Sequence, residues 1–184
     1  MTTFADRPHA ALLVIDVQNA VVAQARRRDK VVATVAGLVN RARLAGVPVV
    51  WGRHADKTLH AGSAAWQIVP ELIPEADEPV VDKGWRDAFD DTGLEQILAQ
   101  RAVGRLIVTG AQTDFCVRST LRGALMRGYD AILVDDAHTT DDMVDPGAPS
   151  AKAVIRHTNL YWAQQCAPGR RGSVMYSHEE VFAG

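Results

Sequence analysis

The sequence predicts an α/β fold in which a parallel β-sheet lies between layers of helices. Short apolar runs rich in β-branched residues alternate along the chain with longer amphipathic stretches. Continuously apolar strands are typical of a parallel sheet that is covered on both faces. The 184 residues suffice for one substantial core. The segments 145–149 and 168–172, which contain Pro and Gly, are short, and this favours loops over domain linkers.

The expected strands are the apolar runs, whose β-branched residues favour a pleated and buried strand. These runs are residues 11–15, 47–51, 79–82, 105–109 and 131–134, with a last short run at 173–176. Asp16 follows the first run, Lys83 follows the third, and Gly110 follows the fourth. The fifth run is expected to end where Asp135 and Asp136 begin.

The expected helices are the amphipathic stretches between these runs. They cover residues 31–45, 94–101, 117–127 and 150–162. Gly46 follows the first of them and Gly128 the third. Glycine is the residue preferred just beyond a helix C-terminus, so both helices have a defined end.

Composition excludes several classes of function. The net charge of −2 and the pI near 6.3 predict no nucleic-acid or membrane partner. No apolar run is long enough to span a bilayer, and the first residues lack the order of a signal peptide. We therefore expect a cytoplasmic protein. With Cys116 and Cys166 as its two cysteines, neither a disulfide framework nor a thiolate-zinc site is expected.

Three reactive residue types stand at predicted strand ends. Asp16 closes the first strand, Lys83 closes the third, and Cys116 lies just beyond the fourth. Parallel sheets bind their ligands at the carboxyl ends of the strands, near the point where the strand order reverses. We expect these three side chains to meet there.

Cys116 lies where a Gly-led turn joins a strand to a helix. The unpaired N–H groups and the dipole of a helix N-terminus favour a thiolate, and the same N–H groups suit an oxyanion. A buried core cysteine is the alternative interpretation. Cys166 is interpreted as structural.

Asp16 and Lys83 can also be interpreted without a catalytic role. A carboxylate that ends an apolar strand is a general base, a metal ligand or a structural acid with a satisfied partner. Lysines are mostly at the surface. A desolvated ammonium near both other groups would hold them as anions or share their proton.

Three motifs resemble the isochorismatase-like cysteine hydrolase family. They are DVQN from Asp16, VVDKGWRDAF around Lys83, and GAQTDFCV ending at Val117. The resemblance implies one isochorismatase-like hydrolase domain over residues 1–184. It implies a Rossmann-like three-layer sandwich with a six-stranded parallel sheet, and assembly into a homo-oligomer, a dimer or larger.

The resemblance also implies a catalytic triad of Asp16, Lys83 and Cys116. In the implied reaction the Cys116 thiolate attacks the carbonyl of a small-molecule amide, ureido or carbamoyl compound and forms a thioester. The backbone N–H groups of Gln112 and Cys116 would form the oxyanion hole, and the Ala111–Gln112 peptide bond would be cis. A non-catalytic or redox-sensing role and a vinyl-ether hydrolase of the isochorismatase type stay as alternatives.

The sequence departs from the nicotinamidases of this family at two places. Their Asp-x-His metal motif is not reproduced by His54, Asp56 and His60, so neither a metal nor another cofactor is expected. Ala20 and Val21 stand where the family often has an aromatic residue, which leaves the substrate open. Further candidates for the substrate pocket are Gln18, His54, Trp66, Trp85 and Phe89. The three aromatic residues among them are equally consistent with core packing. His138 would ordinarily be an exposed loop residue.

Overall fold

The computed structural model describes residues 2–182, so the predicted domain bounds at residues 1 and 184 lie outside the described residues. One seven-stranded sheet runs in the order β3-β2-β1-β4-β5-β7-β6. The strands are β1 (His9–Ile15), β2 (Val49–His54), β3 (Val80–Lys83), β4 (Val103–Ala111), β5 (Asp130–Thr139), β6 (Cys166–Ala167) and β7 (Arg170–Met175). The helices are α1 (Arg28–Leu44), α2 (Leu94–Gln100), the short π-helical turn η1 (Thr113–Val117), α3 (Arg118–Arg127) and α4 (Ala151–Trp162).

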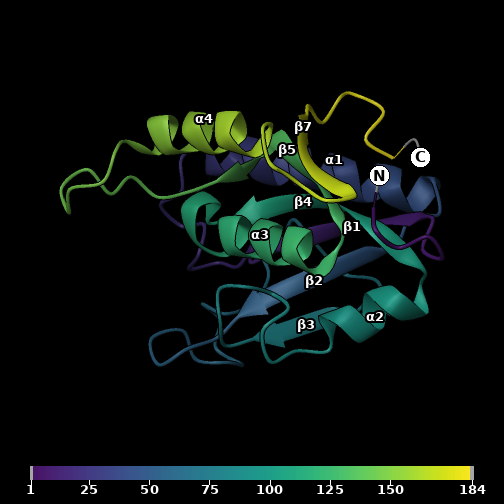
Figure 1. The fold of residues 1–184 in the computed structure, drawn as a ribbon. Coiled ribbons are helices and arrows are strands. Elements are labelled where there is room, and N and C mark those ends of the chain that lie inside the picture. Colours follow the sequence, from purple (N-terminus) through teal and green to yellow (C-terminus); the bar gives the residue numbers. More distant parts are fainter. Residues whose placement is uncertain (1, 183–184) are drawn as a thin grey trace.

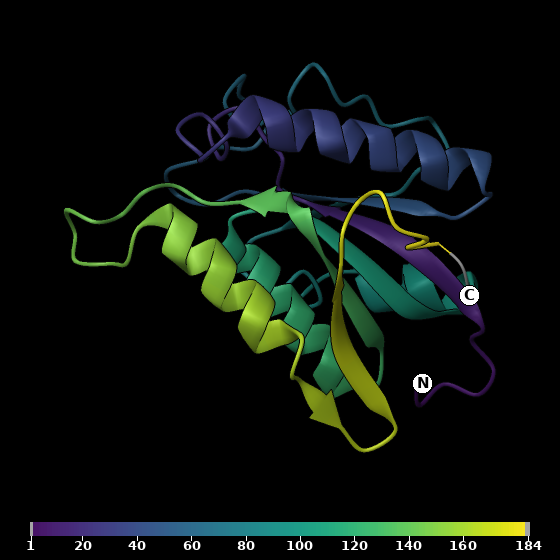
Figure 2. The ribbon, with the colours of Figure 1, turned by 90° about the horizontal axis from the view of Figure 1, so that it is seen from above.

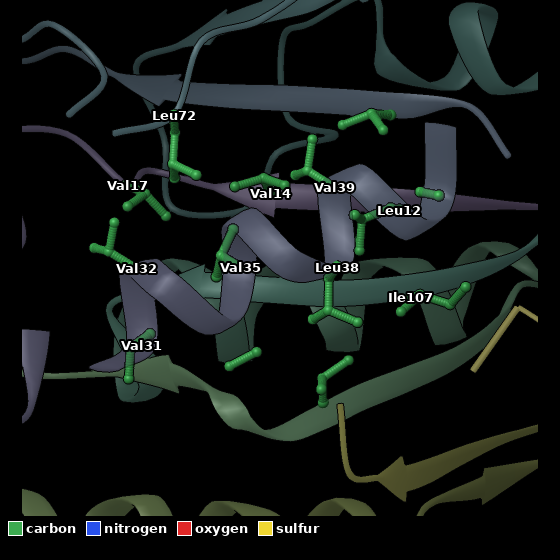
Figure 3. Packing of buried hydrophobic residues seen from close by; sticks show 14 of the residues in the cluster. Leu12, Val14, Val17, Val31, Val32, Val35, Leu38, Val39, Leu72 and Ile107 are labelled. Atoms are coloured by element: carbon green, nitrogen blue, oxygen red, sulfur yellow. The ribbon is translucent and has the colours of Figure 1, made fainter. Parts of the chain in front are cut away.

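One helix, α1, covers one face of the sheet, and α2, α3 and α4 cover the other (Figures 1 and 2). One core cluster joins α1 to alternate residues of the central strand β1, such as Leu12 and Val14 (Figure 3). The other cluster joins Leu13 of β1 to α2 and α3, and Trp162 of α4 belongs to it as well. Alternate residues of a strand point to opposite faces, so β1 is buried on both sides. The predicted three-layer α/β fold is confirmed.

The strand count differs from the six that were expected. Six strands, β1 to β5 and β7, pair in parallel, and β6 adds a seventh that is antiparallel to β7. Cys166 pairs with Arg171 across this short hairpin, whose turn contains Gly169 at a φ of 74°. A two-residue strand is too short to show a hydrophobic period, which is why the sequence did not predict it. Cys166 is exposed.

Strand β5 is longer than the apolar run that predicted it. Val108 pairs with Leu133, but Gly110 pairs with His138, so β5 bulges opposite β4 and then resumes its pairing. The bulge accommodates Asp135 and Asp136, whose polarity marked the end of the predicted strand. As a result His138 is buried inside β5 rather than exposed in a loop.

Gly110 allows the ends of β1 and β4 to come together. Its φ is +113°, and an added Cβ would lie 2.0 Å from the backbone oxygen of Ile15. A side chain at this position would push β4 away from the residue that precedes Asp16. The switch point of the sheet, between β1 and β4, therefore depends on a glycine.

None of the helices within residues 2–182 is both long and apolar enough to cross a membrane.

We predict that Gly110→Ala lowers the free energy of unfolding by more than about 2 kcal/mol, because it adds both strain and a backbone clash. Gly37, inside α1, is the matched control, since an added Cβ there meets no atom within 4 Å. Gly37→Ala should raise the free energy of unfolding by roughly 0.5–1 kcal/mol. Urea denaturation of both variants measures this contrast, and equal effects would contradict the role given to Gly110.

Candidate active site

Asp16 and Lys83 form a buried ion pair at the carboxyl edge of the sheet. Lys83 Nζ donates to Asp16 Oδ2 at 2.7 Å and to the Trp85 carbonyl at 3.1 Å. Both side chains are almost fully buried, at 0% and 1% exposure. Strand β2 separates β1 from β3 in the sheet, so the lysine side chain crosses the end of β2 to reach the carboxylate. Each charge is tolerated here because the other compensates for its lost hydration.

Asp16 turns the chain sharply at the end of β1. Its φ is 48°, which places it in the left-handed region that Asp tolerates better than most residues. Its N–H donates to the Gly52 carbonyl at 3.0 Å, and its own carbonyl accepts from Gln18 at 2.8 Å. The carboxylate thus stands on backbone held by β2 and by the DVQN turn.

Cys116 lies in η1, directly before α3, and is 8% exposed. One ligating atom from each of Asp16, His54 and Cys116 lies within 4.8 Å of the other two. Burial, together with the Asp16 carboxylate, raises the pKa of the Cys116 thiol to about 12, although Lys83 acts in the opposite direction. The resting cysteine is therefore a neutral thiol at neutral pH. Burial therefore opposes the preference for a thiolate that a helix N-terminus would give.

A cavity of about 410 Å³ opens above these groups. Four of the residues expected at the site line it, namely Asp16, His54, Gln112 and Cys116. Lys83 lies beneath Asp16 and is not part of the wall. The peptide bond between Ala111 and Gln112 is cis. The structure thus places Asp16 and Cys116 in the wall of one cavity, with Lys83 bonded to Asp16 behind that wall.

The other pocket candidates lie outside this cavity. Gln18 is fully buried and bonds the backbone of His54 through both of its amide atoms, and also the Trp66 carbonyl. The Trp66 ring is stacked under the guanidinium of Arg53. Gln18 therefore ties the DVQN turn to the end of β2 and to the following loop.

The remaining two aromatic candidates occupy different environments. Phe89 is buried and packs against Tyr129, with 5.6 Å between the ring centroids. Trp85 is 62% exposed, and its carbonyl oxygen, rather than its ring, contacts Lys83. Phe89 is therefore a packing residue of the core. Trp85 contributes its backbone carbonyl to the hydrogen bond with Lys83.

His54 is oriented by Asp56. The His54 Nε2 atom lies 3.2 Å from Asp56 Oδ2, while Asp56 Oδ1 accepts from Thr58 and Leu59. These hydrogen bonds, chiefly those from Thr58, hold the pKa of Asp56 well below its usual range. The set of possible metal-ligating side chains found within residues 2–182 is Asp16, His54 and Cys116. Asp56 and His60, which the sequence placed near His54, do not belong to it.

Several residues of the cavity wall were not anticipated. They are Thr58, Leu59, Arg86, Phe115, Asp141 and Met143. Ala20, Val21 and Asp56, named above from the sequence, also line the cavity. The Arg86 guanidinium lies 4.4 Å above the centre of the Phe115 ring. These two residues are neighbours of Trp85 and Cys116 in the motifs, so their position carried a signal. Asp141 and Met143 follow β5 in a loop without any periodic pattern, and the sequence gives no sign of them.

A chain of hydrogen bonds anchors the start of η1. His138 Nε2 lies 2.8 Å from Asn159 Oδ1, and Asn159 Nδ2 donates to Asp135 Oδ2 at 2.8 Å. The Asn159 oxygen accepts, so His138 carries its hydrogen on Nε2, and Thr113 Oγ1 donates to Nδ1 at 2.8 Å. Burial lowers the pKa of His138 to about 4. A neutral histidine therefore holds the first residue of the turn that carries Cys116.

Comparisons with known proteins agree with this architecture. A family model described as an isochorismatase domain matches residues 10–157. A streptothricin hydrolase of Streptomyces noursei is 37% identical over 84% of this chain and 63% of its own length. The chain thus spans less than two thirds of that relative. The ureidoacrylate amidohydrolase RutB of Enterobacter sp. (strain 638) is 28% identical over 74% of this chain and 81% of its own.

Solved structures share the fold. The crystal structure of a cysteine hydrolase from Pseudomonas syringae pv. phaseolicola 1448A has a TM-score of 0.83 and 25% identity. The match covers 92% of this chain and 89% of that chain.

The Asp16–Lys83 pair predicts strong coupling between two substitutions. Asp16→Asn and Lys83→Met should each lower the free energy of unfolding by roughly 3–5 kcal/mol, because each leaves one buried charge without its partner. The double variant should be destabilised by about 2 kcal/mol or more less than the sum of the two. Urea denaturation of the four proteins measures the coupling, and additive effects would contradict it.

We predict that His138 makes the free energy of unfolding depend on pH. Its pKa falls from the ordinary value of 6.5 to about 4 on folding, so the unfolded chain binds the proton more readily. The stabilisation is present above pH 6.5 and is lost as the pH falls towards 4, by up to about 3 kcal/mol. The stability advantage of the wild type over His138→Gln should shrink across this window in urea titrations.

The exposed His157 provides the control for this prediction. His157→Gln should keep the pH dependence of the wild type. A constant difference between wild type and His138→Gln from pH 7 to pH 4 would rule out the buried neutral histidine as its source.

Proposed function

Because the chain belongs to the isochorismatase family, matched over residues 10–157, we propose that it is a cysteine-dependent hydrolase of small-molecule C–N bonds. The bond cleaved is that of an amide, a ureido or a carbamoyl compound. The observation that carries this proposal is that a thiol and a carboxylate line one cavity, and that an ammonium behind the wall bonds the carboxylate. The three groups are Cys116, Asp16 and Lys83, and their types suit nucleophilic catalysis.

In the first step the Cys116 thiol loses its proton to Asp16 as the sulfur attacks the substrate carbonyl. A general base is required because burial keeps the thiol protonated at neutral pH. Asp16 is the carboxylate beside the sulfur, and its second oxygen is held by Lys83 at 2.7 Å. The lysine also offsets the negative charge that develops on sulfur.

The carbonyl oxygen becomes an oxyanion in the tetrahedral intermediate. The backbone N–H groups of Gln112 and Cys116 are the proposed donors, since both residues line the cavity. Thr113 lies between them and is held by His138 through a 2.8 Å hydrogen bond. A rigid turn would keep both donors in position as charge moves onto the oxygen.

The second half of the reaction returns the enzyme to its starting state. Asp16 gives its proton to the leaving nitrogen, the C–N bond breaks, and the acyl group remains on Cys116 as a thioester. A water molecule then transfers a proton to Asp16 and attacks the thioester, which releases a carboxylic or carbamic acid and restores the thiol. These steps use groups of the chain and water, and they require no cofactor.

Relatives support a hydrolase of this kind. The two curated proteins compared above are named as a hydrolase of streptothricin and an amidohydrolase of ureidoacrylate. Both names fit the cleavage of a small molecule, and the second specifies an amide-type bond. We extend the proposal to one isochorismatase-like domain over residues 1–184, which acts in the cytoplasm as a homo-oligomer. Light scattering during size-exclusion chromatography measures the last property.

Two other functions remain as outcomes of the test. A vinyl-ether hydrolase of the isochorismatase type would need acid chemistry but not the thiol, and an oxidant sensor would need the thiol but not a base. The Asp16–Lys83 pair beside Cys116 favours thiol-dependent hydrolysis over both.

We predict that Cys116→Ala and Cys116→Ser each lower kcat/KM by roughly 10⁴-fold or more, because the first removes the nucleophile and the second replaces the thiol with a much less acidic hydroxyl. The assay measures ammonia or amine release from a panel of amides, ureas and carbamoyl compounds. Cys166→Ser is the matched control, since Cys166 is exposed and is expected to leave turnover unchanged.

Thermal unfolding of the same variants separates activity from folding. Each Cys116 variant should unfold with a free energy within about 1–2 kcal/mol of the wild type. Full turnover by a folded Cys116→Ala protein would sink the proposed nucleophile. A wild-type protein that is inactive on the whole panel, yet oxidised at Cys116 by peroxide, would favour the sensor.

A further inference from the structure

Three buried polar atoms of residues that line the cavity have no hydrogen-bond partner within residues 2–182, namely Asp16 Oδ1, His54 Nδ1 and Asp141 Oδ1. Of these residues, Asp16 and His54 group with Cys116. The other polar atom of each of these two side chains is occupied, Asp16 Oδ2 by Lys83 and His54 Nε2 by Asp56. A buried polar atom without a partner is costly unless something in the working protein satisfies it. Two such atoms beside one cysteine point to a ligand that bonds oxygen, nitrogen and sulfur together.

The arrangement around His54 prepares one nitrogen as a ligand. Asp56 Oδ1 is held by Thr58 and Leu59 at 2.7 to 2.8 Å, so its other oxygen is fixed beside His54 Nε2. With an ionised carboxylate there, the ring hydrogen belongs on Nε2 and the lone pair on Nδ1 is free. Carboxylate-oriented histidines of this kind are typical of metal ligands.

We propose that Asp16, His54 and Cys116 bind a thiophilic divalent cation such as Zn²⁺, which reversibly blocks the site. The ligands come from the ends of β1 and β2 and from η1, and one atom of each lies within 4.8 Å of the other two. Zn²⁺ takes carboxylate, imidazole and thiolate ligands at about 2.0–2.3 Å, which places the ligand atoms about 3.3–3.8 Å apart. A closure of about 1 Å would complete the site, and the cavity leaves a fourth position for water.

Binding converts the thiol into a thiolate. The cation forms a bond to Cys116 Sγ, and the proton of that thiol passes to a solvent base. Asp16 and Cys116 then contribute two negative charges that balance the cation. The Lys83 ammonium, 2.7 Å from Asp16 Oδ2, opposes the cation and weakens its binding. Three protein ligands and a nearby ammonium suit a reversible inhibitor better than a structural ion.

These ligands differ from the group of His54, Asp56 and His60 that lies close together in the sequence. His60 is exposed and takes no part, and Asp56 orients a ligand instead of binding the ion. The cation occupies the proposed nucleophile and the proposed base at once. The inhibition therefore rests on the proposed function, whereas the binding does not.

The binding is tested directly on the full chain after treatment with a chelator. Cys166→Ser is used as the background, so that the exposed thiol does not contribute. Calorimetry with Zn²⁺ should give one equivalent, and Cd²⁺ should produce the ultraviolet charge-transfer band of a cadmium thiolate. That band should disappear in Cys116→Ser.

Variants around His54 locate the site. His54→Ala should weaken Zn²⁺ binding by roughly 100-fold or more, and Asp56→Asn, which removes only the orienting carboxylate, by roughly 10- to 100-fold. His60→Ala is the matched control and should bind as the background does. Circular dichroism checks that each variant is folded, and Asp56→Asn keeps the test valid if His54→Ala is not.

The result that would overturn the site is unchanged Zn²⁺ affinity in both His54→Ala and Asp56→Asn, or the absence of a cadmium-thiolate band in the background protein. For inhibition, hydrolysis should fall in proportion to occupancy and return after the chelator is added. Cation binding by a protein that hydrolyses no member of the panel would reject the proposed function and leave the cation site standing. Hydrolysis that does not change when Zn²⁺ is added would reject the proposed inhibition and leave the proposed hydrolase function standing.

Discussion

Two opposite charges buried side by side at the carboxyl edge of the sheet constrain everything around them. Asp16 and Lys83 are 2.7 Å apart and almost inaccessible to water. Neither charge would be tolerated there alone, so the end of β3 must stay near the end of β1, even though β2 lies between them. The pair thereby sets the floor of the cavity and the field in which Cys116 sits.

That field acts on the cysteine in two directions. Burial and the carboxylate keep the thiol protonated, with a pKa of about 12, while the ammonium favours ionisation. A neutral thiol is a weak nucleophile, but it does not need a permanent counter-charge in a buried place. In the proposed mechanism the proton leaves only when substrate is attacked, so the base must stand beside the sulfur. The same proximity makes the site open to a metal ion that displaces the proton.

The shape of the cavity depends on contacts that involve no reacting atom. Gln18 bonds both backbone groups of His54 and so holds the end of β2 against the DVQN turn. On the opposite side, His138 and Asn159 hold Thr113, the first residue of η1. Gly110 lets β4 approach Ile15 closely enough for the two sides to meet. Each contact joins elements that are far apart in the chain, and none involves a reacting atom.

The sequence by itself determined the class of fold and the placement of Asp16, Lys83 and Cys116 at neighbouring strand ends. These are local signals. An apolar run that forms a buried strand, and a polar residue at its end, can both be recognised from adjacent residues, as for Asp16, Lys83 and Cys116. The sequence did not reveal β6, the bulge in β5, or the cavity residues Asp141 and Met143. These depend on pairing between distant segments and have no period of their own. The protonation of Cys116 and the neutral state of His138 were likewise decided by tertiary structure, because a pKa follows from burial and from charges that only the folded chain brings near.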